Sequence, residues 1–167
     1  MHSQRIPLVC VAILVALANP AIARSTLCKK SEINYSSCRS GARLISLCAS
    51  SDLSGERGYM QFRYGRPGHL EVAYPDTTQH PRFAFYGKQY TFGDGAEYRL
   101  TFKVGDLVYV LFDNTVWPTP RQDGGIRHGL TIYRNGKIVK ELPCINPTST
   151  IHHFEGHIFG DGDLSAE

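Results

Sequence analysis

The sequence predicts an all-β protein: a single antiparallel domain of about eight to ten short strands, arranged as a small barrel or sandwich and stapled by disulfides. Three observations lead to this fold class. Turn signals recur about every ten residues, with β-branched and aromatic residues between them. Outside the N-terminal segment, no stretch keeps the helical spacing of apolar residues. An even number of cysteines follows that segment. A barrel is the favoured arrangement, because closure removes exposed strand edges.

The N-terminal segment, residues 1–23, has the pattern of a secretory signal peptide. Arg5 supplies a positive start, and residues 6–17 form an uncharged apolar run of 12 residues. Ala21-Ile22-Ala23 is a small-residue cleavage signal. The apolar run is shorter than the roughly 20 residues that a membrane-spanning helix needs. We therefore expect cleavage after Ala23 and a secreted or periplasmic protein.

The remaining chain, residues 24–167, has 144 residues, which suits one domain with a substantial core. We expect the β domain to cover residues 24–146 and a polar, flexible tail to cover residues 147–167. The leader contains one charged residue, so its removal changes the formal charge from +3 (18 − 15) to +2 (17 − 15). With this small charge and no Lys/Arg cluster, neither nucleic acid nor a membrane span is expected.

Four cysteines remain after the leader, and their spacing favours disulfides. No close C-x-x-C pair is present, which argues against a zinc site and against a thioredoxin-type redox motif. An even number of cysteines in an exported chain is typical of a disulfide framework, which here has three possible connectivities. The four residues are Cys28, Cys38, Cys48 and Cys144.

The first hairpin offers a way to choose among the connectivities. If Ser40-Gly41 is a two-residue loop, Cys38 faces Arg43 and Cys48 faces Ile33, so the two cysteines are not opposite. A disulfide needs Cα atoms within about 7 Å, which favours Cys28–Cys48 together with Cys38–Cys144. A longer loop would change this register, so the other connectivities stay open.

Four further hairpins are predicted along the chain. Residues 58–75 alternate apolar and polar residues on both sides of a Gly/Pro turn, which predicts a half-buried hairpin. Two short runs flank Gly87-Lys88, and a strong hairpin follows, whose arm Leu107–Phe112 is apolar enough for a central strand. Asn135-Gly136 is the strongest hairpin signal. Residues 114–129 contain two prolines and a glycine pair, which predicts a long surface loop.

The motif string YSSCRSGARLISLC, followed by GYMQFRYGRPGHLEVAYP, resembles an uncharacterised family of small exported proteins from Gram-negative bacteria. The resemblance covers residues 35–75 well and is architectural beyond them. The chain departs from the family pattern at Ala42-Arg43, where Gly-Lys is usual, and in its long tail after Cys144. The resemblance implies export and a β fold, and it implies no activity.

The hairpin of residues 58–75 carries a candidate binding patch formed by Arg63, Arg66, His69 and Glu71. One interpretation is an ordinary cross-strand pair of Arg63 and Glu71 on the solvent face, worth some tenths of a kcal/mol. The other is a site for an anion or a partner, with Arg66 at the loop tip. A concave face that also gathers Tyr64 would favour the second interpretation.

The tail contains several metal-ligand residue types, but no cofactor or metal is expected. His153 and His157 have i, i+4 spacing, yet the segment is not the HExxH of zinc proteases, and Gly156 weakens a helix there. Asp161 and Asp163 lack the rest of a calcium loop. The tail, with His152 and Glu155, is interpreted as a solvated segment.

No catalytic residue is assigned, because no nucleophile motif such as G-x-S-x-G occurs. We therefore expect a binding module for a protein or glycan partner, either an inhibitor or an envelope-associated protein. A hydrolase with a shallow site near His128 and Asp113, beside the long loop, is the first alternative. A structural envelope component is the second.

Overall fold

The computed structural model describes residues 25–121, 123–149, 158–161 and 164. The predicted signal peptide lies outside the described residues, and so do His152, His153, Glu155 and His157 of the tail. Within the described part, no helix has the length and apolar character needed to cross a bilayer.

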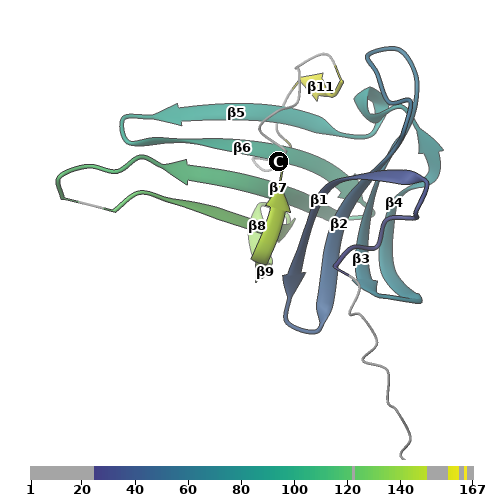
Figure 1. Cartoon of the computed structure of the whole chain (residues 1–167), viewed down its shortest axis with the longest axis horizontal. Coiled ribbons are helices and arrows are strands. Elements are labelled where there is room, and N and C mark those ends of the chain that lie inside the picture. Colours follow the sequence, from purple (N-terminus) through teal and green to yellow (C-terminus); the bar gives the residue numbers. More distant parts are fainter. Residues whose placement is uncertain (1–24, 122, 150–157, 162–163, 165–167) are drawn as a thin grey trace, which may run out of the picture.

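The described strands form two stacked sheets, whose strands cross steeply (Figure 1). In the first sheet the order is β10-β1-β2-β3-β4. Its strands are β1 (Glu32–Ser40), β2 (Arg43–Ser50), β3 (Met60–Arg66), β4 (His69–Gln79) and β10 (Ile145–Ser149). In the second sheet the order is β11-β5-β6-β7-β8-β9. Its strands are β5 (Tyr86–Phe92), β6 (Gly95–Val104), β7 (Leu107–Val116), β8 (Gly125–Arg134), β9 (Lys137–Pro143) and β11 (Gly160–Asp161).

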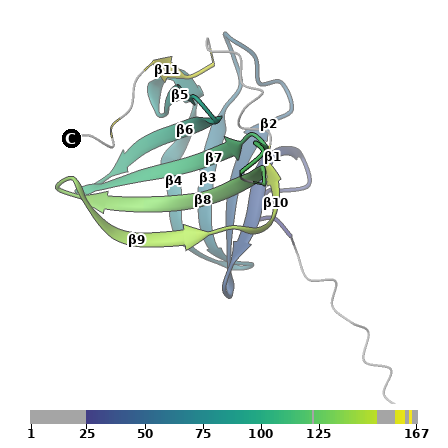
Figure 2. The same ribbon diagram turned by 90° about the vertical axis from the view of Figure 1, so that its left-hand side faces the viewer.

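The all-β, disulfide-stapled fold is confirmed as a sandwich, and the preference for a barrel is wrong. The described strands leave both sheets open, with β10 and β4 at the edges of the first and β11 and β9 at the edges of the second. Between β1 and β10 the chain passes from the first sheet to the second through the short 3-10 helix η1 (Pro81–Phe83) and returns to the first through Cys144, and β11 then belongs to the second sheet again. Figure 2 shows the second corner, where β9 leads directly into β10.

The core between the sheets is rich in aromatic side chains. Phe62 of β3 lies against Phe102 of β6, with ring centroids 4.8 Å apart, and Phe102 stacks on Tyr109 of β7 at 5.1 Å. The predicted alternation is confirmed for the apolar positions of β3, because Met60, Phe62 and Tyr64 are all buried. These rings supply much of the apolar area that stabilises the domain.

The expectation of a half-buried hairpin is wrong for β3, which is covered on both faces. Gln61 and Arg63 point away from the core, as alternation requires, yet both are buried. Residues 25–31, which we call the N-terminal arm, account for this because the Arg63 guanidinium donates to the backbone oxygen of Leu27. Leu27 N in turn donates to Ser46 Oγ on the same outer face. The arm therefore forms a third, partial layer.

The favoured disulfide connectivity is confirmed. Cys28–Cys48 ties the N-terminal arm to β2, and Cys38–Cys144 ties β1 to the corner between β9 and β10. The predicted turn at Ser40-Gly41 is wrong, because Ser40 pairs with Arg43 and the turn is Gly41-Ala42. Cys38 and Cys48 are still not opposite each other, because Cys38 lies opposite Ile45 and Cys48 lies opposite Asn34.

Of two interruptions predicted in what is now the second sheet, one is absent and the other is shorter than expected. Gly87 and Lys88 lie within the continuous strand β5, paired with Leu100 and Arg99. The long surface loop is shorter than expected, because β7 continues to Val116 and β8 begins at Gly125. Cross-strand pairing extends both strands against the local turn signals. The Asn135-Gly136 turn is confirmed, and both residues have positive φ, at 51° and 68°.

The predicted boundary at residue 146 is also wrong. The strand β10 continues to Ser149 and pairs with β1. Further on, Phe159 is buried against Phe85, and Gly160 pairs with Tyr86 in a short parallel ladder. These parts of the expected flexible tail belong to the domain because they fill the core and extend the sheet edges.

Candidate functional site

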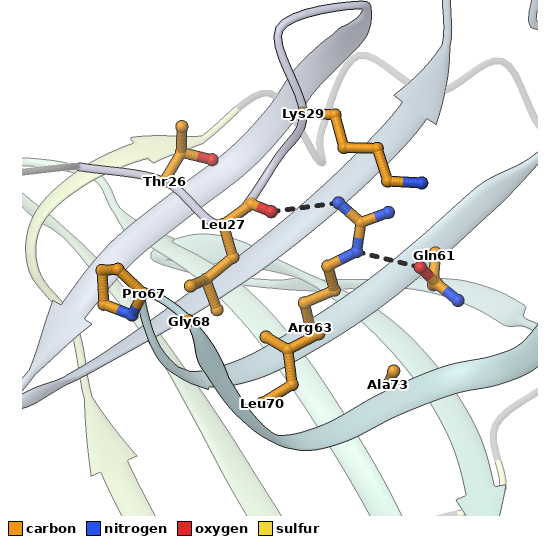
Figure 3. A pocket seen from close by; sticks show the side chains of 9 residues that line it. All are labelled: Thr26, Leu27, Lys29, Gln61, Arg63, Pro67, Gly68, Leu70 and Ala73. Carbon is orange, nitrogen blue, oxygen red and sulfur yellow. Dashed lines mark hydrogen bonds between the residues drawn. The ribbon is translucent and has the colours of Figure 1, made fainter.

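A pocket of about 530 Å³ lies on the outer face of the first sheet, beside the N-terminal arm. We call it the arm pocket. One wall comes from the arm and the other from the β3–β4 hairpin, as Figure 3 shows with all lining residues labelled. Lys29, Gln61 and Arg63 supply polar groups, whereas Leu27, Pro67 and Leu70 supply apolar surface. The pocket therefore has a polar region and an apolar region.

The polar region is built on an ion pair between Arg63 and Glu32, whose side chains are only 4% and 1% exposed. The pair is bidentate: Arg63 Nη1 lies 2.6 Å from Glu32 Oε2, and Nη2 lies 2.7 Å from Oε1. Arg63 Nη1 also donates to Leu27 O at 3.0 Å, and Nε donates to Gln61 Oε1 at 2.9 Å. Burial of the pair is tolerated because nearly every donor has a partner.

The carboxylate of Glu32 has two further donors. Tyr59 donates its hydroxyl at 2.8 Å, and the backbone N–H of Lys29 donates at 2.6 Å. Burial alone would raise the pKa of Glu32. The hydrogen bonds from Arg63, Lys29 and Tyr59, together with the Arg63 charge, outweigh burial and lower the pKa from 4.5 to about 2. Glu32 is therefore ionised throughout the physiological range.

The four residues of the predicted patch do not form one surface. Arg63 is opposite Ala73 in the ladder and pairs with Glu32, so the expected pair of Arg63 with Glu71 is wrong. Glu71 instead accepts a hydrogen bond from Arg43 Nε at 2.5 Å. The remaining two, Arg66 and His69, are exposed at the ends of the turn whose residues line the arm pocket.

Tyr64 does not join the patch, for a simple geometric reason. Tyr64 is adjacent to Arg63 in a strand, so the two side chains point to opposite faces. Tyr64 faces the core, where its hydroxyl accepts a hydrogen bond from Lys140 Nζ at 3.3 Å. It therefore takes no part in the outer-face pocket.

No sequence pattern singles out Lys29 and Glu32, the arm residues that complete the pocket. Glu32 is 31 residues from Arg63, and no local spacing connects them. The available signal was the disulfide, since joining Cys28 to Cys48 folds the arm across β2 and brings it to β3. Cys28, Glu32 and Cys48 also bring three potential ligand atoms within 4.8 Å. The two sulfurs form the disulfide, so this group offers no thiolate for a metal.

The second predicted location, near Asp113 and His128, is a real side-chain pair. The residues face each other across β7 and β8, and His128 Nδ1 lies 2.9 Å from Asp113 Oδ1. Their side chains are 14% and 2% exposed, respectively. They lie on the core-facing side of the sheet, two residues along from the buried Leu111 and Leu130. A carboxylate at Nδ1 orients an imidazole for proton transfer at Nε2.

No family model matches the sequence, and neither a curated protein nor a solved structure matches the chain. The fold and the pocket by themselves define a disulfide-stapled β-sandwich with a covered outer face. The class of ligand therefore has to be argued from the residues of the site.

Proposed function

We propose that this protein is an exported binding module, secreted or periplasmic, that holds its ligand in the arm pocket. The observation that carries the proposal is a preformed pocket with one cationic and one apolar region. Export is supported by the signal-peptide pattern, by the resemblance to exported proteins and by the two disulfides.

The charges of the pocket favour a ligand with an anionic group. Arg63 uses four of its five N–H donors within the protein, and Glu32 balances its charge. Lys29 is exposed, and Figure 3 shows its ammonium group extending toward the Arg63 guanidinium. The positive charge offered to a ligand is therefore that of Lys29.

The apolar region favours a ligand with an apolar body next to that anion. Leu27, Pro67 and Leu70 lie together at the end of the pocket away from Lys29 (Figure 3). Contact with such surface contributes about 25 cal/mol for each Å² removed from water. A carboxylate attached to an apolar group, free or at the end of a partner protein, has this chemistry. A partner protein would make this chain an inhibitor or an envelope-associated adaptor.

The arm is fixed before any ligand arrives. The Cys28–Cys48 bond anchors it covalently, and the Ser46 hydroxyl accepts from Leu27 N at 3.0 Å. Ser37 Oγ contributes by donating to Thr26 Oγ1 at 2.8 Å. A pocket that is already ordered avoids the entropy loss of ordering a loop on binding.

We expect Lys29→Gln to lower the affinity for the ligand about tenfold, equivalent to about 1.4 kcal/mol, because the substitution removes the cation of the pocket. The ligand is first isolated by capture from envelope extract on the oxidised protein, and its affinity is then measured by calorimetry. Lys30→Gln is the matched control, since Lys30 is the next residue, is exposed and does not line the pocket. Equal affinities of the two variants, or no ligand at micromolar concentration, would contradict the proposal.

A hydrolase is the second candidate, and the contact between His128 and Asp113 favours it. His128 Nε2 would act as a general base on water, with Asp113 holding the ring in place. In a broad screen of ester, amide and glycoside substrates, His128→Ala is expected to reduce any turnover at least a hundredfold. Asp113→Asn tests the orienting role, with circular dichroism to check folding. Turnover that survives both substitutions excludes this site.

A further inference from the structure

A second hollow lies on the opposite side of the molecule, on the outer face of the second sheet. Glu97, Asn114 and Arg127 form one cross-strand row over β6, β7 and β8. The adjacent row contains Asp113 and His128, which face the core side. Because successive residues of a strand alternate between faces, the Glu97 row points outward. The Glu97 row lies on the second sheet, whereas the arm pocket lies on the first.

The row lines a hollow of about 430 Å³, whose remaining walls are Phe112, Ile126, His128, Pro143, Cys144 and Pro147. A smaller hollow of about 130 Å³ shares Glu97 and Phe112 with it. The two hollows are therefore neighbours along the same sheet face, with a carboxylate and an aromatic ring between them. A ligand that occupies both hollows would extend along this face of the sheet.

The polar groups of this face are held in place by one another. Glu97 Oε2 accepts from Asn114 Nδ2 at 2.8 Å, and Oε1 accepts from Arg99 Nε at 2.5 Å. The Arg99 guanidinium also lies 4.9 Å from the ring centre of Tyr90. Glu97 is only 14% exposed, so its carboxylate forms a fixed part of the wall. Hydrogen-bonding groups that are already fixed can bind the hydroxyls of a ligand without a further loss of side-chain entropy.

The apolar surface of the hollow is aromatic and flat. The Phe112 ring lies directly against Gly129, where an added Cβ would come within 2.6 Å of the ring carbon Cζ. Glycine at this position therefore allows the ring to lie over β8. With the rings of Pro143 and Pro147, it offers the kind of surface on which the C–H face of a sugar packs.

We propose that this hollow binds a saccharide chain that carries carboxylate groups. The hollow supplies four components for this: a fixed carboxylate, an amide, a flat apolar surface and the exposed guanidinium of Arg127. Arg99 balances Glu97, which leaves Arg127 as the net charge and favours an acidic sugar over a neutral one. A guanidinium binds a carboxylate with two parallel hydrogen bonds. The site is independent of the arm pocket.

The test uses the oxidised protein and a tetrasaccharide of galacturonic acid, followed by NMR chemical-shift perturbation and calorimetry. We expect shifts at Asn114 and Arg127, and Arg127→Gln is expected to weaken binding at least tenfold. Lys103→Gln is the matched control, because Lys103 is an exposed cation on the same face that does not line either hollow. It is expected to change affinity less than twofold, as is Lys29→Gln in the arm pocket.

Three results would overturn the proposal. A neutral galactose tetrasaccharide that binds as tightly as the acidic one would remove the role of Arg127. A tetraglutamate peptide that binds as tightly would show recognition of charge alone or of a peptide. Loss of binding in Lys29→Gln, with none in Arg127→Gln, would assign the saccharide to the arm pocket.

Discussion

Replacement of Glu32 by Gln is expected to lower the free energy of unfolding by about 3 to 5 kcal/mol. Gln has nearly the same size but no charge, so the Arg63 guanidinium would stay buried without its counter-ion. Removing one partner of a buried ion pair is far more damaging than removing an exposed pair. Urea unfolding, followed by Tyr and Trp fluorescence, measures the change.

The same carboxylate predicts a defined loss of stability in acid. The folded-state pKa of Glu32 is about 2, below the ordinary value of 4.5. A lowered pKa stabilises the folded state above pH 4.5, and this contribution is lost as the pH falls from 4.5 to about 2. The difference of about 2.5 pKa units corresponds to about 3 kcal/mol. Solvent close to the pair screens the charges, so this figure is an upper bound on the contribution.

Glu71→Gln is the matched control for both measurements. Glu71 also pairs with an arginine, Arg43, but the two side chains are 29% and 37% exposed. Such a pair contributes about 0 to 1 kcal/mol. If the two Glu→Gln variants lose the same stability, or if Glu32→Gln keeps the acid sensitivity of the wild type, the buried pair does not have the role described.

The two disulfides are expected to contribute unequally to stability. Removing Cys38–Cys144 as the double alanine variant should lower the free energy of unfolding by about 5 kcal/mol, and removing Cys28–Cys48 by about 3 kcal/mol. The difference arises because the first bond closes a separation of 106 residues and the second a separation of 20. A longer closed loop removes more conformational entropy from the unfolded chain. Thermal and urea unfolding of the two variants measure this order.

Loss of the two disulfides is expected to affect ligand binding in the opposite order to stability. Cys28 anchors the arm that carries Lys29, whereas Cys38–Cys144 lies in the core and away from the arm pocket. At a temperature where both variants are folded, loss of Cys28–Cys48 is expected to weaken the ligand of the arm pocket more. Faster amide exchange at residues 25–31 in that variant alone would support this. An unchanged arm would show that its hydrogen bonds suffice.

Three elements, one strand and two turn signals, show how much of the fold local sequence patterns predict. The alternation of Met60, Phe62 and Tyr64 was enough to predict a strand and its core-facing side. The turn at residues 40–41 was misplaced by one position, because Ser-Gly and Gly-Ala are similar turn signals and cross-strand packing selects between them. The Gly87-Lys88 pair predicts a turn, yet pairing with β6 keeps it extended.

The two candidate sites also differ in how far the sequence predicts them. Asp113 and His128 were singled out in the sequence, and they meet because β7 and β8 place them directly opposite. The arm pocket was not predictable in this way, since its ion pair joins Arg63 to Glu32, a residue that no sequence pattern connects with it. The sequence had no pattern that showed what covers the outer face of β3.

By itself, the sequence determined the strand periodicity, the favoured pairing of the cysteines and the side of β3 that faces the core. These properties depend on alternation, turn chemistry and the spacing of cysteines, all of which are local. Only the tertiary structure decided that the sheets form a sandwich, that the arm covers Arg63 and that Glu97, Asn114 and Arg127 lie in one row. Each of these features depends on which distant segments of the chain pack together and bury their surfaces from water, and a local sequence pattern does not contain that information.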